Sequence, residues 1–237
     1  LRCFWNKQYE KRTLEIWSDL CATEGIVLDI GAHSGIYSLV ANNSIKRGEG
    51  AVFSFEPHHL NFARLNLNFR ANNFSTKTLF MNAVGEKNET LPFSVSGNLD
   101  YLTSGGAIGK FENRSSNLVQ TVGIDSFLNE PGKKNVSVMK IDVEGHEYKC
   151  FLGMEKTISM SNPLILFECM SKNDNKEIYS FLKTHGYRIF IIDDNENQLE
   201  EIDEVNPILD YNNNLIHHKI NRIAVPKRNV DLLKPFF

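Results

Sequence analysis

Hydrophobic and polar residues along this chain follow two alternating patterns. Short apolar runs rich in β-branched and aromatic residues predict strands, and between them apolar positions recur every three or four residues, as on one face of a helix. The predicted strands are 26–30, 51–55, 78–84, 136–142, 164–168, 187–193 and 222–225, and the clearest helices are 13–21, 35–41, 57–71 and 175–185. This alternation predicts an α/β fold, with a mostly parallel sheet covered by helices on both faces.

The helix predicted over 57–71 begins at Pro57, because proline suits the first helical position. Leu60, Ala63, Leu67 and Ala71 recur in it at helical spacing. We therefore expect these four side chains to form the buried face of the helix.

One stretch, at about 89–109, interrupts the alternation. It is polar, and Gly97, Gly105 and Gly106 fall within it, which predicts an irregular insertion. No repeat, low-complexity tract or Pro/Gly/Ser-rich linker divides the chain. We therefore expect a single domain over 1–237, with an N-terminal helical part at 1–22 and a region of unassigned structure at about 194–237.

Composition and charge narrow the classes of partner. A formal net charge of −3 and a pI near 6.2 do not favour nucleic acid or an anionic membrane. No apolar run approaches the roughly 18 to 20 residues that span a bilayer. The four cysteines show neither CxxC nor metal-ligand spacing, so buried free thiols and a cytoplasmic location are expected. The chain begins at Leu1 instead of methionine, which leaves open whether a targeting segment has been removed.

The turn after the first predicted strand has the features of a ligand-binding loop. Asp29 lies at the strand end, and Gly31 and Gly35 follow it four residues apart. Glycine allows backbone to approach a ligand closely, and the amides at the next helix N-terminus can receive a carboxylate such as that of a methionyl group. A plain strand-to-helix turn is the alternative interpretation.

Glu56 ends the second predicted strand, 27 residues after Asp29. A carboxylate in this place can accept hydrogen bonds from two ribose hydroxyls, in nicotinamide and in sulfonium cofactor sites alike. A nicotinamide dehydrogenase would need GxGxxG after the first strand, and this chain has His33 and Ile36 where that pattern requires glycine. The glycine pattern therefore favours S-adenosylmethionine.

A cluster of ionisable residues ends the fourth long strand and begins the next turn. It comprises Asp142, Glu144 and His146, and Glu168 ends the neighbouring strand. Strand alternation also places Lys140 on the same face as Asp142. We expect Asp142 or His146 to take the proton from an acceptor hydroxyl, and Glu144 and Glu168 to orient the acceptor.

These residues also have structural interpretations. Glu144 and Glu147 could complement a helix N-terminus, and His146 could be a hydrogen-bonded structural histidine. Asp142, Glu144 and Glu168 carry the hard oxygen atoms that magnesium or calcium prefers. Because no dedicated ligand spacing accompanies them, no metal is predicted.

The chain resembles the FkbM-like methyltransferases. The matching segments are VLDIGAHSGIYS at 27–38, FEPHHLNFARLNLN at 55–68, MNAVG at 81–85, GIDSF at 123–127, KIDVEGHE at 140–147 and LILFE at 164–168. The resemblance implies a Rossmann-like class I fold with a seven-stranded sheet whose last strand is antiparallel. It also implies methylation of a hydroxyl with S-adenosylmethionine as donor.

The resemblance also assigns roles residue by residue. Asp29, Gly31 and Gly35 would contact the methionyl part, Glu56 the ribose, and Asn82 with Ala83 the adenine side. Ala32 and Pro57 belong to the same two turns and complete the expected cofactor site. Asp142, Glu144 and His146 would face the methyl group or the acceptor.

The expected acceptor is a small molecule or a glycan, with no nucleic acid and an unassigned oligomeric state. Two alternatives from other classes remain, namely an inactive binding subunit with this fold and a NAD-dependent oxidoreductase. Asp29, Glu56 and Asp142 speak against the first, because an inactive site does not need them. Binding of S-adenosylmethionine, of NAD or of neither would separate the three possibilities.

Overall fold

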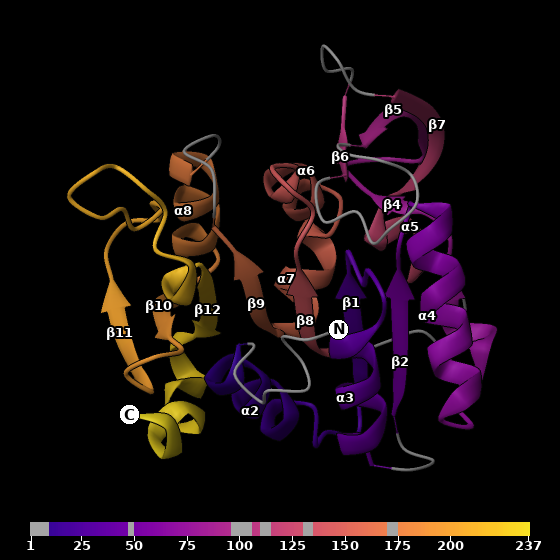
Figure 1. Ribbon diagram of the computed structural model, residues 1–237. Coiled ribbons are helices and arrows are strands. Elements are labelled where there is room, and N and C mark those ends of the chain that lie inside the picture. The colour runs from indigo at the N-terminus through magenta and orange to yellow at the C-terminus, as the bar shows by residue number, and fades with distance from the viewer. Residues whose placement is uncertain (1–9, 47–49, 96–105, 110–114, 130–134, 170–174) are drawn as a thin grey trace.

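A computed structural model describes residues 10–46, 50–95, 106–109, 115–129, 135–169 and 175–237. Eight strands of this part form the larger of two sheets, in the order β11-β10-β12-β9-β8-β1-β2-β3 (Figure 1). Their bounds are β1 Ile26–Ile30, β2 Ala51–Phe55, β3 Leu79–Phe80, β8 Val136–Ile141, β9 Leu164–Glu168, β10 Tyr187–Asp193, β11 Gln198–Ile202 and β12 Asn221–Pro226. The predicted strands 26–30, 51–55, 164–168 and 187–193 are confirmed with their bounds.

The centre of the large sheet is parallel. β1 pairs in parallel with β2 and β8, β2 with β3, and β8 with β9. β12 is antiparallel to both of its neighbours, which confirms the expected antiparallel last strand. The expectation of seven strands was wrong by one, because β11 adds an antiparallel edge strand to β10 within the region left unassigned.

Helices cover both faces of this sheet, as predicted. Their bounds are α2 Lys11–Leu20, α3 Ile36–Ser44, α4 His59–Ala71, α5 Ile124–Phe127, α6 Glu147–Leu152, α7 Glu155–Ser161, α8 Asn175–Thr184, with short 3-10 turns η1 Thr76–Thr78, η2 His217–Lys219 and η3 Lys227–Phe236. One buried cluster joins α2, α3 and η3 to the sheet, and a second joins α6, α7 and α8 to its other face. Alternate residues of each central strand supply the two clusters.

A second sheet of four strands stands beside the ends of the parallel strands (Figure 1). It contains β4 Ala83–Val84, β5 Glu89–Val95, β6 Gly106–Ile108 and β7 Ser115–Val122, and β5 pairs antiparallel with β7 along its whole length. The expected irregular insertion at 89–109 is therefore corrected, because its described residues form strands. The strand predicted at 78–84 is also corrected, since β3 and β4 belong to different sheets.

Helix α4 differs from its prediction in two respects. It begins at His59, so Pro57 precedes its N-cap, His58, instead of occupying the first helical position. Its buried residues are Asn61, Leu65 and Phe69, whereas the side chain of Leu67 is 65% exposed. The helix is thus rotated relative to the apolar face that the sequence pattern predicted.

Three cysteines, Cys21, Cys150 and Cys169, are buried free thiols, as expected, and Cys3 lies outside the described residues. Within the described ranges, no helix is both long enough and apolar enough to cross a membrane.

Candidate active site

The pleat of the large sheet places the candidate residues on one face. Val27, Val138 and Leu166 pack in the cluster beneath α2 and α3. Because side chains alternate along a strand, Asp29, Lys140 and Glu168, each two residues farther along, point to the same side at the strand ends. The register pairs Asp29 with Ser54 of β2 and with Lys140 of β8. Polar side chains therefore form a row across the ends of neighbouring parallel strands.

Asp29 is fully buried under the turn that follows β1. Its carboxylate accepts a hydrogen bond from the hydroxyl of Ser38 in α3, and that hydroxyl is also 2.7 Å from the hydroxyl oxygen of Ser54. Burial raises the pKa of Asp29, although Lys140 and Ser38 both favour its charged form. The Oδ1 atom has no hydrogen-bond partner among the described residues.

The two glycines of this turn have separate steric reasons. Gly31 has φ +81°, and a Cβ added to it would lie 1.7 Å from the carbonyl oxygen of Asp142. Gly35 has φ +94°, and its Cβ would lie 2.4 Å from the side chain of Leu65. Gly31 thus lets the turns after β1 and β8 touch, and Gly35 lets the first turn lie against α4.

Glu56 is held in place by the backbone on both sides of it. One carboxylate oxygen accepts the amide of His33 and the other accepts the amide of His58, each at 2.8 Å. The residue is 5% exposed, and burial raises the pKa of Glu56 to about 7 in spite of these two hydrogen bonds. The turns after β1 and β2 are therefore joined through a single carboxylate.

The remaining residues of the expected cofactor site lie around these turns. Ala32 is buried, and its amide donates to the carbonyl of Phe55 at 2.9 Å. Pro57 is half-buried between Glu56 and the start of α4. Asn82 is half-buried after β3, with its side-chain amide 3.4 Å from the carbonyl oxygen of Gln120, and Ala83 is buried in β4.

Asp142 and Glu168, predicted to act together, are brought together at the ends of β8 and β9. The Lys140 ammonium lies 2.7 Å from Oδ2 of Asp142, and Glu168 is hydrogen-bonded to the same carboxylate. Burial opposes the charge on Asp142, but Lys140 outweighs it and the pKa of Asp142 is lowered. Burial and the charge of Asp142 raise the pKa of Glu168 well above its usual range. Both pKa shifts favour the proton of the pair on Glu168, with Asp142 as its hydrogen-bond acceptor.

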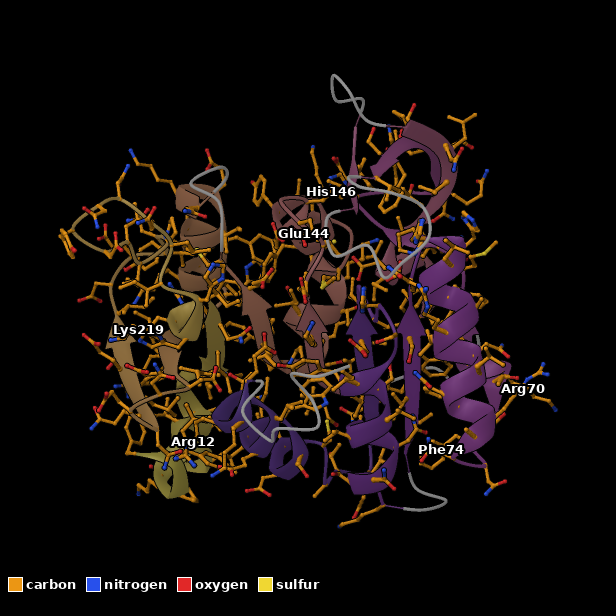
Figure 2. All side chains as sticks on the ribbon, viewed as in Figure 1. Arg12, Arg70, Phe74, Glu144, His146 and Lys219 are labelled. Atoms are coloured by element: carbon orange, nitrogen blue, oxygen red, sulfur yellow. The ribbon has the colours of Figure 1, made fainter. Side chains whose placement is uncertain are left out.

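Glu144 and His146 lie on the turn between β8 and α6 (Figure 2). Glu144 has φ 55°, and its charge contributes to the raised pKa of Glu168. His146 is directed toward the small sheet, since its Nε2 would be 3.3 Å from a Cβ added at Gly85. The structure therefore groups Glu144 with the Asp142–Glu168 pair and places His146 against the beginning of the second sheet.

A comparison with protein families decides the class of this domain. The family model described as the Methyltransferase FkbM domain matches residues 29–189. The chain belongs to the FkbM methyltransferase family. The matched segment runs from Asp29 of β1 to Ile189 of β10 and so contains the strand ends described above. The FkbM domain is an S-adenosylmethionine-dependent methyltransferase domain, which favours the sulfonium cofactor over the nicotinamide alternative for this site.

Solved structures share the fold of this FkbM domain at low sequence identity. A FkbM methyltransferase from Methylobacillus flagellatus KT has a TM-score of 0.51 and 15% identity, over 84% of this chain and 42% of its own. A putative methyltransferase from Streptococcus mutans in complex with SAH has a TM-score of 0.52 and 7% identity, over 90% and 94%. An O-methyltransferase from Bacillus cereus in complex with SAH has a TM-score of 0.51 and 11% identity, over 91% and 80%.

The chain thus spans less than half the length of the Methylobacillus protein. No curated protein matches it.

The residues of the FkbM domain fit S-adenosylmethionine at two points. The Glu56 carboxylate is fixed by two amides and keeps lone pairs on both oxygens, as a partner for ribose hydroxyls requires. The buried Oδ1 of Asp29, which lacks a described partner, lies beneath the glycine turn and suits a cationic amino group. Among the described residues, no group of three His, Cys, Asp or Glu side chains could hold a metal ion.

Three residues at this site were not among the predicted site residues. Lys140 was placed on the face of Asp142 but given no role, and its side chain is only 4% exposed. Tyr37 of α3 lies beneath it, with the Lys140 ammonium 4.4 Å from the ring centre. Glu10, which precedes α2, accepts a hydrogen bond from the Tyr37 hydroxyl. The alternation of side chains along the strand predicted the face on which Lys140 lies. Tyr37 and Glu10 are brought here by helix packing alone.

Proposed function

We propose that this FkbM domain methylates a hydroxyl group on a small molecule or a glycan, with Asp142 receiving the hydroxyl proton. The observation that carries the proposal is the pair of carboxyl groups, Asp142 and Glu168, at the ends of β8 and β9. The pair adjoins the turn after β1, because the carbonyl of Asp142 abuts Gly31. A hydroxyl held at this pair would lie beside the cofactor turn.

Bound S-adenosylmethionine supplies an electrophilic methyl group on a sulfonium. Glu56 would bind the ribose, while Asp29, Gly31, Ala32 and Gly35 would shape the methionyl end of the site. Pro57, Asn82 and Ala83 would border the adenine side. These roles rest on the placement of each residue around the turns after β1, β2 and β3.

Methyl transfer forms an oxygen–carbon bond as the sulfur–carbon bond breaks, and the hydroxyl proton must leave the acceptor. Asp142 is suited to receive it, because its carboxylate is ionised and its side chain is 32% exposed. Glu144 and Glu168 would orient the acceptor. A carboxylate of lowered pKa is a weak base, so positioning, at roughly 7 to 11 kcal/mol, should exceed the about 3 to 5 kcal/mol from proton transfer.

His146 was the alternative proton acceptor. Its direction toward Gly85 favours a different role, in which His146 lies between the turn after β8 and the small sheet. The acceptor would then be bounded by this turn on one side. Asp142 remains the better candidate, since it lies next to both Glu168 and the turn after β1.

The test is label transfer from methyl-labelled S-adenosylmethionine into fractionated host extract, with glycan, lipid, protein and small-molecule fractions counted separately. Wild-type protein should label a glycan or small-molecule fraction, and Asp142→Asn should not. Glu155→Gln, which changes an exposed acid of α7 outside the site, is the matched control and should label as wild type does. Label confined to the protein or lipid fraction would contradict the acceptor class. Cofactor binding without any label would favour the inactive binding subunit.

A further inference from the structure

We propose that Lys140 is the positioning residue of this site: its sealed ammonium keeps Asp142 ionised and leaves Glu168 as the neutral partner. The inference rests on the proposed role of Asp142 as proton acceptor. Lys140 itself touches no reacting atom, because its side chain is 4% exposed whereas that of Asp142 is 32% exposed. One member of the ion pair is closed off from the site and the other is open to it.

The fold encloses the ammonium from several elements. Lys140 of β8 lies beside Asp29 of β1 in the sheet register. The ring of Tyr37 in α3 covers the ammonium at 4.4 Å from its centre, a distance at which a cation is attracted to an aromatic face. The Tyr37 hydroxyl is in turn fixed by Glu10. The Lys140 ammonium is thus covered by the Tyr37 ring and forms its ion pair with Asp142 at 2.7 Å.

Charge balance explains why a single cation decides the state of the site. Four carboxyl groups, those of Glu10, Asp29, Asp142 and Glu168, interact electrostatically with Lys140. Four ionised acids around one cation would leave a large uncompensated negative charge in a buried place, which is strongly unfavourable. In the absence of another cation, the carboxylate in direct contact with the ammonium, that of Asp142, is the one that stays ionised at the least cost.

The directions of the pKa shifts agree with this balance. Burial raises the pKa of Glu10, Asp29 and Glu168, while Lys140 overcomes burial at Asp142 and lowers its pKa. Burial alone would lower the pKa of Lys140, but the surrounding carboxylates, Asp142 foremost, raise it. The groups that act on Asp142 or Glu168 from the other side are His33, whose charge would favour ionised Asp142, and Glu144, which favours neutral Glu168.

A consequence for catalysis follows from the geometry. If the proton of the pair resided on Asp142, the carboxylate that is open to the site could not accept the proton of a hydroxyl. Lys140 prevents this by its 2.7 Å contact with Asp142. Asp142 is therefore already ionised, and able to accept a proton, before the acceptor binds. The cation thereby acts on the reaction through Asp142.

The test is a carboxyl ¹³C NMR titration of the protein labelled at aspartate side chains, with the Asp142 signal assigned by its loss in Asp142→Asn. In wild type, Asp142 should remain ionised down to a pH below the usual aspartate range. In Lys140→Met its midpoint should move above that range, and in Lys140→Arg, which keeps the cation, it should return toward the wild-type value. An Asp142 midpoint that is the same in Lys140→Met as in wild type would overturn the inference.

Lys140→Met could fail to fold, because it leaves a buried carboxylate without its partner. Lys140→Arg alone then tests the inference, since Asp142 should keep its low midpoint. The double variant Lys140→Met/Asp142→Asn should regain the fold, because neither charge remains. In that protein a glutamate-labelled titration should show the Glu168 midpoint closer to the ordinary range than in wild type, since Asp142 raises the pKa of Glu168 more than Lys140 lowers it. An unchanged Glu168 midpoint would contradict the coupling of the pair.

The titrations test the role of Lys140 independently of the proposed methyl transfer. The titrations need no acceptor, so a failed shift removes the role of Lys140 while leaving methyl transfer untouched. Conversely, full label transfer by Asp142→Asn would remove the proton-acceptor role even if Lys140 proved to hold Asp142 ionised. With the acceptor in hand, Lys140→Met should displace the acidic limb of the kcat–pH profile to higher pH, and Lys140→Arg should restore it. A limb that does not move in Lys140→Met would contradict the inference.

Discussion

The active-site end of the large sheet has two halves, the ends of β1 and β2 and the ends of β8 and β9. The two halves hold their buried carboxyl groups in different ways. Beside β1 and β2, Glu56 is anchored by two backbone amides and Asp29 by the Ser38 hydroxyl. Beside β8 and β9, Asp142 and Glu168 bond to each other, and Asp142 also pairs with the Lys140 ammonium. Acids of the first half are tied to the scaffold, and those of the second are tied to one another.

This difference indicates a division of labour. A carboxylate fixed by backbone amides presents its oxygens in one geometry, as recognition of a ribose requires. Two coupled carboxyl groups share their protons, so a change at one alters the other. We therefore expect substitutions in the first half to change cofactor affinity and substitutions in the second half to change the rate of methyl transfer.

The largest effect is expected from Asp142→Asn, which keeps the shape of the side chain and removes its charge. Label transfer should fall by about 10² to 10⁴, the contribution of a positioned general base. The affinity for SAH, measured by calorimetry, should stay within a few-fold of wild type. A transfer rate close to that of wild type would show that the second half does not perform the chemistry.

A substitution at Gly31 tests the contact between the two halves. Gly31→Ala should destabilise the fold by about 2 to 5 kcal/mol, as the sum of left-handed backbone strain and overpacking against the Asp142 carbonyl. Gly145→Ala is the matched control, because Gly145 has φ +91° with nothing within 4 Å of an added Cβ. Gly145→Ala should lower the free energy of unfolding only by the left-handed backbone strain, about 1 to 2 kcal/mol. Equal losses in urea unfolding would mean that the close approach at Gly31 does not exist.

Glu56 gives the first half a pH signature. Because its pKa is raised to about 7, the carboxyl group loses its proton as the pH rises through neutrality and then accepts hydroxyl donors fully. SAH affinity should therefore increase by about tenfold between pH 6 and pH 8, the ratio of the ionised fractions. Calorimetry of Glu56→Gln should show weaker binding that does not vary with pH. The same pH dependence in Glu56→Gln would assign it to another group.

His146→Ala is expected to have the smallest effect. Since His146 lies toward Gly85 and the small sheet, its loss should slow label transfer by less than about tenfold, below the usual range for a general base. Gly85→Ala, which crowds the Nε2 of His146, should have a similar small effect. A decrease as large as that of Asp142→Asn would make His146 the proton acceptor.

Much of the central sheet could be predicted from the sequence, because buried parallel strands appear as continuous apolar runs. β1 is buried at all of its positions, and its bounds were predicted to the residue. β11 was missed because it is a polar edge strand in which only Leu199 is buried. The small sheet was missed because β5 and β7 pair residues that lie between 20 (Val95 with Ser115) and 32 positions apart (Glu89 with Thr121), which no local pattern reveals.

Helix α4 shows how one sequence can carry two helical patterns. Leu60, Ala63, Leu67 and Ala71 recur at helical spacing, but so do Phe62, Leu65 and Phe69. The structure buries Leu65 and Phe69 of the second set, together with Asn61, and partly buries Phe62. Larger side chains remove more apolar area from water, so the aromatic set determines the rotation of the helix.

The candidate site was predictable to the extent that it depends on strand ends. Asp142 and Glu168 end neighbouring parallel strands, which places them together for any sequence with this order of elements. The enclosure of Lys140 by Tyr37 and Glu10 depends on how α2 and α3 pack on the sheet. Such contacts between distant segments leave no trace in spacing or composition.

The most direct test of the division between the two halves is one paired measurement on Glu56→Gln and Asp142→Asn. SAH affinity by calorimetry and label transfer at saturating S-adenosylmethionine are determined for both variants. Glu56→Gln should lose affinity and retain most of its saturated rate, whereas Asp142→Asn should retain affinity and lose the rate. Loss of the same property in both variants would contradict the account.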